Sequence, residues 1–237
     1  MPLFWTPSSH CDDDTLRARL EAATAELEFE IYGLVTWLPL SANQPTAHLL
    51  TNADERWKSV IMNRDLGQAR AIVDWCKTHH EPIAWNAEAM PSLDALEGPA
   101  NDGRMGRRHR WSQGVRDSLG VDGILTLSRS HPIGVEEAQR KRFMFRMLAT
   151  KAHQRWLGHV RARTIAELPD QLSPREIEVL RWFADGKIAE DVATLLGIKL
   201  TTVRFHATNA ARKLGAENTT SAAYRALVLG LLHRPID

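Results

Sequence analysis

The chain has 237 residues, of which 43% are hydrophobic and 25% are charged, and its 30 Lys and Arg nearly balance its 29 Asp and Glu. This composition excludes a disordered or fibrous protein, and the net charge of +1 means that any basic surface must be local. The length accommodates one large domain or two modest ones. Its two widely separated cysteines, Cys11 and Cys76, predict free thiols, so we expect a cytoplasmic protein without a membrane span.

The first elements along the chain are a helix, two strands and two further helices. Residues 12–14 are acidic and precede apolar residues spaced as on one face of a helix: Leu16, Leu20, Ala23 and Leu27. Residues 31–40 predict a strand that ends at a proline, and residues 48–51 form a second strand that could pair with it. Helices are predicted around residues 57–62 and 69–78, followed by an extended piece at 82–85 and a loop over 91–103.

A strand over 121–128 and a long helix from Val135 complete the first part. The order of these elements predicts an α+β fold: an N-terminal α/β/α sandwich with a central antiparallel sheet, in front of a C-terminal four-helix helix-turn-helix domain. We expect the N-terminal domain to span residues 1–163, the linker 164–171 and the C-terminal domain 172–237.

Several patterns in the first part have plain structural interpretations. An arginine-rich stretch predicts a solvated loop or a partner surface, with nucleic-acid contact as the weaker alternative; its members are Arg104, Arg107, Arg108, Arg110 and Arg116. Cys76, His79 and His80 lack a nearby fourth ligand, so no metal site is expected. The sequence contains no nucleophile–base pair and no phosphate loop, which predicts a protein that is not an enzyme and needs no cofactor.

The C-terminal part begins with a capping box. Ser173, Pro174 and Glu176 occupy the cap, first and third positions of a helix, and Gly186 is placed to end it. A second helix over 188–196 is expected to bury Val192, Leu195 and Leu196, before a tight turn at Gly197. A third helix is expected from about 201 to 214 and a fourth over 220–232. Two short helices joined by a glycine turn are a helix-turn-helix candidate.

The third of these helices has a cationic, hydroxyl-bearing outer side. Between Lys199 and Lys213 there are four cations and no acid. Its outward positions are Thr201, Thr202, Arg204, Phe205, Thr208, Asn209 and Arg212. Such groups suit contacts to phosphates and base edges, whereas the alternative interpretation is the solvated side of a small bundle. The glycine turn in front of this helix favours the DNA-binding interpretation.

Residues 172–232 resemble the helix-turn-helix of LuxR-type transcription regulators, on the segments LSPREIEVLRWFADGK, VATLLGI and TTVRFHATNAARKLG. The resemblance implies a homodimer that binds palindromic double-stranded DNA. In the family the fourth helix pairs two DNA-binding domains, and the small residues of 222–230 would allow the two copies of this helix to pack closely. Where the family usually caps the recognition helix with Ser, this chain has Lys199, so Thr201 or Thr202 is expected to form the cap. The residues expected at DNA are Lys199, Thr201, Thr202, Arg204, Thr208, Arg212 and Lys213, with Lys199 and Lys213 on phosphates.

The N-terminal part resembles the autoinducer-binding domain of acyl-homoserine-lactone receptors, on Trp57, on Trp85 preceded by Pro82, and on Trp111 followed by Ser112. It lacks the acidic pair after a first strand that a phosphorylated receiver domain needs. The resemblance implies a ligand pocket lined by Trp57, Ile61, Arg70, Ala71, Trp85, Arg110 and Trp111.

The predicted pocket departs from the family at its polar end. Aligned from Trp57, the chain has Ile61 where the family has a tyrosine, and Arg70 and Ala71 where it has an aspartate and a proline. Because arginine only donates hydrogen bonds, it cannot accept the ligand amide N–H, which argues against ordinary acyl-homoserine lactones. We expect an orphan, ligand-independent regulator whose side chains fill the cavity. The alternatives are an anionic or carbonyl-rich ligand bound through Arg70 and Arg110, and a heterodimerising anti-activator.

Overall fold

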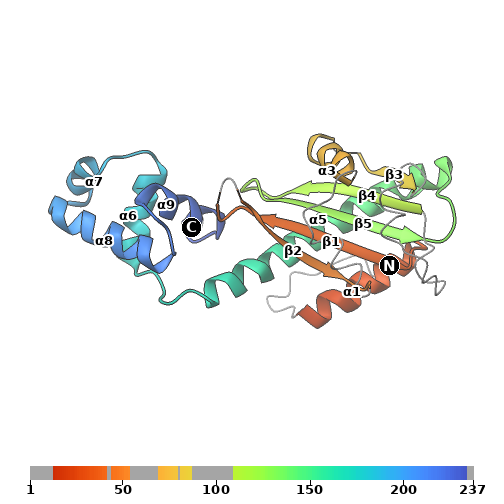
Figure 1. Ribbon diagram of the computed structural model, residues 1–237, viewed down its shortest axis with the longest axis horizontal. Coiled ribbons are helices and arrows are strands. Elements are labelled where there is room, and N and C mark those ends of the chain that lie inside the picture. The colour runs from red at the N-terminus through yellow and green to blue at the C-terminus, as the bar shows by residue number, and fades with distance from the viewer. Residues whose placement is uncertain (1–12, 42–43, 54–68, 80, 87–108, 234–237) are drawn as a thin grey trace. The chain divides into compact units, whose positions relative to one another are not determined.

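The computed structural model describes residues 13–41, 44–53, 69–79, 81–86 and 109–233, with the side chains of residues 69–71 and 86 outside the described set (Figure 1). The chain divides into two compact units, one of Met1–Trp37 and Ala47–His159, the other of Leu38–Thr46 and Val160–Asp237. The predicted helix over 57–62, the predicted loop over 91–103, Cys11 and Asp12 lie outside the described residues. No described helix is long and apolar enough to cross a membrane.

The first unit is a five-stranded antiparallel sheet between helices. Its elements are α1 (Asp13–Glu26), β1 (Ile31–Leu38), β2 (Thr46–Thr51), α3 (Ala69–Thr78), β3 (Ile83–Asn86), β4 (His109–Arg116), β5 (Asp122–Arg129) and α5 (Val135–Ala166). The strand order is β2-β1-β5-β4-β3. Helices α1 and α5 cover one face of the sheet and α3 covers the other (Figure 1). The predicted α/β/α sandwich is therefore confirmed.

Alternation along the strands assigns each side chain to one of these faces. In β1 every second residue is buried, starting at Tyr32 and continuing through Leu34 and Thr36. This side faces α1 and α5: the Thr36 hydroxyl lies 3.1 Å from Nδ1 of the buried His153 on α5. In α1 the predicted apolar face is also found buried, as Leu16, Leu20 and Ala23. The spacing of apolar residues in the sequence thus predicts the core correctly here.

Strand β4 was not predicted. Residues 109–116 pair with β5 along their whole length, and 109–112 also pair with β3. The segment contains few β-branched or aromatic residues, so its sequence gives little sign of a strand, and its conformation depends on its neighbours in the sheet. Arg110 and Arg116, which the sequence predicts in a solvated loop or a partner surface, belong to this strand; Arg104, Arg107 and Arg108 lie outside the described residues.

Gly114 in β4 lies where α3 approaches the sheet. A Cβ atom there would be 1.8 Å from the carbonyl oxygen of Cys76. Because that atom belongs to the helix backbone, Gly114→Ala is expected to displace α3 and lower the free energy of unfolding by about 1–3 kcal/mol. Gly158→Ala in α5 is the control, since no atom lies within 4 Å of its Cβ position. There we expect a gain of about 0.5–1 kcal/mol in urea unfolding. Equal stability of the two variants would contradict this close approach.

The second unit contains a compact four-helix domain. Its helices are α6 (Pro174–Ala184), α7 (Ala189–Leu196), α8 (Leu200–Lys213) and α9 (Thr219–Val228). The four predicted helices are confirmed. Helix α5 continues to Ala166, so the predicted linker starts inside its last turn, where the Thr164 hydroxyl donates to the Val160 carbonyl. Leu195 was expected to be buried but is 51% exposed, because the short helix α7 turns only one side to the core, at Val192.

The small residues of α9 pack inside this domain. Ala222, Ala223 and Ala226 are all buried, and α9 lies against α6 and α8. The expectation that these small residues serve close packing between two copies is therefore corrected for the three alanines, which belong to the domain's own core. The larger residues Tyr224 and Leu227 remain exposed on α9.

Candidate nucleic-acid interface and sensory face

The start of α6 is fixed by its capping box. The Ser173 hydroxyl accepts a hydrogen bond from the Glu176 N–H at 3.2 Å, and the Glu176 carboxylate accepts one from the Ser173 N–H at 2.7 Å. Gly186, at φ 80°, follows the end of the helix in the left-handed conformation that the sequence predicts for it. The predicted cap of this helix is confirmed in both of its hydrogen bonds.

Lys213 binds the same carboxylate. Its ammonium donates to Oε2 of Glu176 at 2.9 Å and to the Gln171 carbonyl at 2.9 Å. Burial by itself raises the pKa of Glu176, but the hydrogen bonds from Lys213 and Ser173 outweigh it, and the pKa lies below its ordinary value. Lys213 therefore fastens the end of α8 to the start of α6. This position corrects its expected role as a phosphate contact.

The start of α8 differs from the prediction. The N-cap is Lys199, with extended backbone at φ −68° and ψ 145° and no hydrogen bond from its side chain. Its carbonyl oxygen accepts from the N–H groups of Thr202 and Val203, so the helix begins at Leu200. Thr201 and Thr202 lie in the first turn and do not cap it, which corrects the predicted cap. The Lys199 carbonyl accepts the first hydrogen bonds of the helix, so α8 starts without a side-chain cap.

Helix α8 is anchored on one side and open on the other. Val203 and Ala207 are buried in a cluster with Val179 and Val192 from the neighbouring helices. We define the recognition face as the exposed residues on the opposite side: Thr201, Arg204, Phe205, Thr208 and Arg212. Thr202 is partly exposed beside them. The sequence-predicted positions, apart from Lys213 and the cap, are thus gathered on one surface of a helix that follows a glycine turn at φ 62°.

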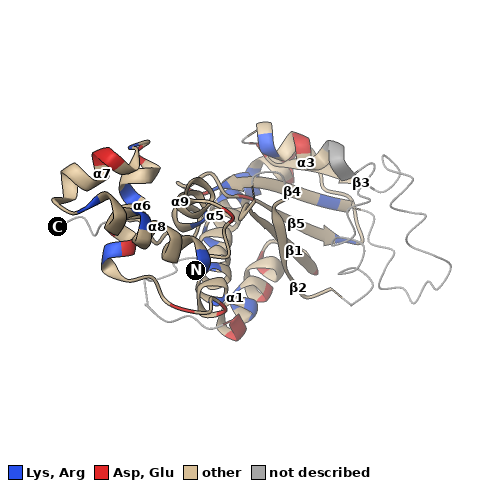
Figure 2. Ribbon diagram, turned by 60° about the vertical axis from the view of Figure 1, so that its left-hand side comes forward, with Lys and Arg blue, Asp and Glu red and all other residues tan. Residues whose placement is uncertain are grey.

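The charge of the recognition face is positive and weakly compensated. Helix α8 contains no acid, whereas the first turn of α7 carries two (Figure 2). Arg204 lies 3.3 Å from Glu190, and Arg212 lies 3.2 Å from Asp170. All four side chains are more than half exposed, so these pairs are screened by water and contribute little. Both guanidinium groups are therefore available to exchange a carboxylate for a phosphate or a base edge.

A second group of polar side chains lies on the α3 side of the sheet. We define the sensory face as Trp85, Arg110, Ser112, Thr126 and Ser128, which alternation and strand register place on one side of β3, β4 and β5. The indole N–H of Trp85 donates to the Ser112 hydroxyl at 2.9 Å, and that hydroxyl lies 2.8 Å from the hydroxyl of Thr126. These contacts link the predicted Trp85 to the hydroxyls of Ser112 and Thr126, neither of which the sequence places in the predicted pocket.

Arg110 is the charged member of the sensory face. Its side chain is only 1% exposed, and its guanidinium carbon lies 5.0 Å from the centre of the Trp85 ring. The cation therefore stacks on the indole in a buried setting. Arg116, six residues further along β4, is instead exposed and holds Asp122 through two hydrogen bonds of 2.6 and 3.1 Å. The arginine-rich stretch thus contains residues with quite different surroundings.

The structure does not bring the whole predicted pocket together. Trp111 points to the opposite side of the sheet from Arg110, where it packs between Phe29 and Phe145 at centroid distances of 6.1 and 4.5 Å. It is a core residue because adjacent residues of a strand face opposite sides. Arg70 and Ala71 lie in the first turn of α3, and their side chains, together with Trp57 and Ile61, lie outside the described residues.

Comparison with known families matches both units. Residues 170–226 match the family described as bacterial regulatory proteins, luxR family, and residues 12–156 match the autoinducer binding domain. Among curated relatives, a quorum sensing-dependent transcriptional regulator, RpaR of Rhodopseudomonas palustris, is 41% identical over 222 residues, covering 92% of this chain and 88% of the relative. The regulatory protein SdiA of Escherichia coli is 27% identical over 225 residues, covering 90% of this chain and 88% of SdiA.

Solved structures show the same relationship. A crystal structure of Escherichia coli SdiA superposes with a TM-score of 0.70 at 26% identity, covering 95% of this chain and 94% of the other. A structure of SdiA in complex with octanoyl-rac-glycerol gives a TM-score of 0.71 at 25% identity, covering 96% of this chain and 92% of the other. With the capping box, the glycine turn and the exposed face of α8, these matches are decisive. The chain belongs to the LuxR family of bacterial quorum-sensing transcription regulators, with an autoinducer-binding domain in front of a helix-turn-helix domain.

Proposed function

We propose that this regulator binds palindromic double-stranded DNA as a homodimer and reads it with the recognition face of α8. The observation that carries the proposal is a helix anchored on its inner side whose outer side presents two exposed arginines, two hydroxyls and no acid. Arginines recognise guanine edges and phosphates, and hydroxyls donate to either. Phe205, which is 62% exposed, adds an apolar surface that suits a thymine methyl group.

The proposed dimer uses the exposed side of α9. Tyr224 and Leu227 are 36% and 41% exposed there, although the three alanines of the same helix are buried. Exposed aromatic and aliphatic side chains on one helix favour a contact with a second copy. A two-fold dimer would place two copies of α8 on successive half-sites of the DNA, about one helical turn apart.

We further propose that the N-terminal domain acts without an ordinary acyl-homoserine lactone. Arg70 stands where the ligand amide needs an acceptor, and a guanidinium offers none. On the sensory face, Trp85 already donates to Ser112 and stacks with the buried Arg110. Because these polar groups interact with one another, this face forms its interactions without a ligand.

Isothermal titration of the full chain with acyl-homoserine lactones tests this proposal. We expect no saturable binding at micromolar concentrations. An Arg70→Asp variant, which restores an acceptor, separates two causes: continued absence of binding supports a cavity filled by side chains, whereas a gain of binding shows an open cavity that Arg70 alone closes to lactones. Binding of a lactone to the unchanged chain at micromolar or tighter affinity would contradict the proposal outright.

A second candidate keeps the sensory function but changes the ligand. The buried Arg110 offers a fixed positive charge to an anionic or carbonyl-rich molecule, with Arg70 as its predicted neighbour. The related SdiA forms a complex with octanoyl-rac-glycerol, so a protein of this fold accepts a ligand other than a lactone. An Arg110→Gln variant that loses ligand-dependent regulation in cells would favour this candidate over the ligand-independent one.

A further inference from the structure

The outward side of helix α5 combines exposed apolar side chains with positive charge. Phe143 is 71% exposed and Met147 is 40% exposed, and the two residues are one helical turn apart. Among residues 138–159 of this helix the exposed charged residues are all cations, namely Arg140, Arg142, Arg146 and Lys151. Large apolar side chains that remain exposed beside charged ones are typical of a surface that binds another protein.

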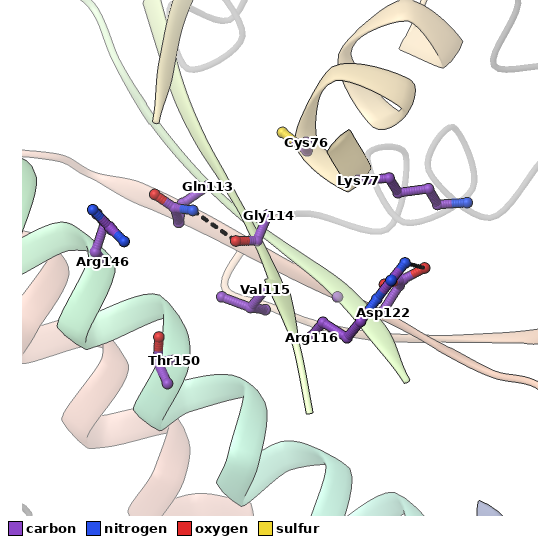
Figure 3. A pocket seen from close by; sticks show the side chains of 10 residues that line it. Cys76, Lys77, Gln113, Gly114, Val115, Arg116, Asp122, Arg146 and Thr150 are labelled. Atoms are coloured by element: carbon purple, nitrogen blue, oxygen red, sulfur yellow. Dashed lines mark hydrogen bonds and ion pairs between the residues drawn. The ribbon is translucent and has the colours of Figure 1, made fainter. Parts of the chain in front are cut away.

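The other sides of α5 already have neighbours. Its inner side is buried against the sheet, as at Phe145. One flank contacts α1 through Lys141 and His159. On the other flank, Arg146 and Thr150 line a cavity beside β4 (Figure 3). We define the α5 outer face as the exposed residues on the remaining side: Arg140, Phe143, Met147, Lys151 and Gln154.

Helix α1 presents a surface of the opposite character. Its exposed charged residues are all acids, namely Asp13, Asp14, Glu21 and Glu26. Three exposed alanines lie on the same outward side of the helix, at Ala18, Ala22 and Ala25. Such small side chains allow a facing helix to approach closely and leave room for its larger side chains. The outward side of α1 is therefore acidic and smooth, whereas the α5 outer face is basic and carries large apolar side chains.

The two helices are neighbours on one face of the sheet and run in opposite directions (Figure 1). At one end of the pair, the Lys141 ammonium donates to the Leu27 carbonyl at 2.9 Å. At the other end, His159 contacts Asp13. Because one contact joins the end of α1 to the start of α5 and the other joins the start of α1 to a later turn of α5, the helices lie side by side along the whole length of α1.

These end contacts set the level of each residue along the pair. Ala25 is two residues before Leu27 and Phe143 is two residues after Lys141, so the two lie at about the same level. By the same count Ala22 lies at about the level of Met147. Each large apolar residue of the α5 outer face thus has an alanine at its level on α1.

A two-fold axis parallel to the helices makes these levels meet between two copies. Such an axis places α1 of each copy over α5 of the other and leaves every residue at its own level. Phe143 and Met147 of one copy then pack on the alanines of the second copy's α1. The cations of the α5 outer face then face the acids of that α1, and the whole contact occurs twice in the dimer.

Charge disfavours the two other symmetric ways of pairing these helices. A two-fold axis over α5 would bring Arg140 and Lys151 of the two copies together. A two-fold axis over α1 would bring together the acids of the two copies, such as Glu21. Like charges repel in both arrangements, whereas α1 on α5 joins opposite charges.

We propose that the α5 outer face is a docking surface for α1 of a second copy of this chain, and that this contact joins the N-terminal domains. The proposal rests on the proposed homodimer for its partner, but it uses a different domain from the α9 contact. The sensory face lies on the opposite side of the sheet from α1 and α5, so the docked second copy does not cover it.

Disulfide crosslinking between two differently tagged full-length chains tests the contact. Both chains carry Cys11→Ser, and the remaining Cys76 is buried. One chain carries Ala22→Cys and the other Met147→Cys. Under mild oxidation we expect a mixed crosslinked dimer, and little crosslinking when either chain is oxidised alone. Thr78→Cys, exposed on α3 across the sheet, replaces Met147→Cys as the control and should give no mixed dimer with Ala22→Cys.

The outcomes of the crosslinking experiment separate this surface from the homodimer itself. Sedimentation of the unchanged chain with its selected duplex shows whether a dimer forms. A dimer without the crosslink between positions 22 and 147 refutes the docking surface and leaves the homodimer intact, whereas a chain that stays monomeric refutes both. Crosslinking of the Met147→Cys chain to itself would show that α5 packs on α5 and would also overturn the proposal.

A charge exchange tests the electrostatic part of the contact. Arg140→Glu and Glu26→Arg are each expected to weaken the dimer roughly tenfold in sedimentation of the full chain, because each places like charges in contact twice per dimer. The two changes combined restore opposite charges and should return the affinity to within about threefold of that of the unchanged chain. Lys77→Glu on α3 is the matched control and should have no effect. A combined variant that dimerises no more tightly than either single variant would contradict the pairing of α1 with α5.

Discussion

Arg204→Ala combined with Arg212→Ala is expected to weaken DNA binding by at least about 100-fold, with the helix-turn-helix domain still folded. Each well-placed arginine contact to a base contributes about 1–3 kcal/mol, and a dimer loses four of them. The two side chains are 65% and 60% exposed, and their ion pairs among the described residues are with exposed carboxylates, so their removal costs the fold little. Mobility shift with a duplex selected from a random pool by the unchanged chain measures the effect, and circular dichroism checks the fold.

The matched control removes the partners of these arginines. Glu190→Gln combined with Asp170→Asn deletes the two carboxylates that compete with DNA for Arg204 and Arg212. This variant should bind DNA as well as the unchanged chain or more tightly. If the arginine variant loses DNA binding but still regulates its targets in cells, the chain acts through protein contacts, as a heterodimerising anti-activator would. That outcome would contradict the proposed mode of action.

Glu137→Gln is expected to have the largest effect on stability, about 3–5 kcal/mol, because it leaves a buried arginine without its counter-charge. Arg129 is 1% exposed and donates to the two carboxylate oxygens of Glu137 at 2.6 and 2.5 Å. Lys141, one turn further along α5, donates to the same carboxylate at 2.8 Å. These contacts join the end of β5 to the start of α5. Glutamine keeps the shape but offers one neutral acceptor in place of the carboxylate.

Urea unfolding of Glu137→Gln and of Glu136→Gln measures this contribution. Glu136 is the neighbouring acid in the first turn of α5, and it is exposed, so its replacement should change the free energy of unfolding by less than about 0.5 kcal/mol. A similarly small change for Glu137→Gln would show that the Arg129 pair does not hold the domain together.

The Glu137 carboxylate makes the free energy of unfolding depend on pH in the acid range. The hydrogen bonds from Arg129, together with those from Lys141, outweigh burial and lower the pKa of Glu137 from 4.5 to about 2. A lowered carboxyl pKa contributes stability above the unfolded value, and this stability is lost as the pH falls through the folded value. We expect a loss of about 3 kcal/mol between pH 4.5 and pH 2 that is missing in Glu137→Gln. Parallel acid profiles of the two proteins would contradict this assignment.

Local chemistry explains why the C-terminal domain is predictable from sequence. Ser173 and Glu176 cap a helix through atoms only three residues apart, and Gly186 and Gly197 adopt the left-handed conformation that glycine allows. The predicted cap of α8 is wrong because the prediction relied on a side-chain acceptor to mark the start of the helix. Lys199 is the N-cap although its side chain accepts no hydrogen bond. Lys213 was misassigned because its partner Glu176 is 37 residues away in the sequence.

The N-terminal domain depends more on contacts between distant residues. β1 was predictable because it is rich in aromatic, branched and other large apolar residues, whereas β4 is held by pairing with β3 and β5, which no local pattern reveals. Missing β4 led to two errors. The sequence predicts Arg110 both in a solvated arginine-rich loop and in the ligand pocket, and its burial in β4 rules out the loop. Trp111 is predicted in the same pocket as Arg110, but adjacent strand residues face opposite sides of the sheet, and Trp111 packs in the core. The alternation of Arg110 and Ser112 was the available signal for the sensory face.

The most direct test of the DNA-binding surface is site-specific photocrosslinking. Phe205 on the recognition face and Tyr224 on α9 are both exposed aromatic residues, so azidophenylalanine replaces either with little change in shape. With a selected duplex bound, irradiation should crosslink DNA to position 205 and a second protein chain to position 224. A chain that binds DNA but crosslinks it from position 224 and never from position 205 would show that the exposed side of α8 does not read the duplex.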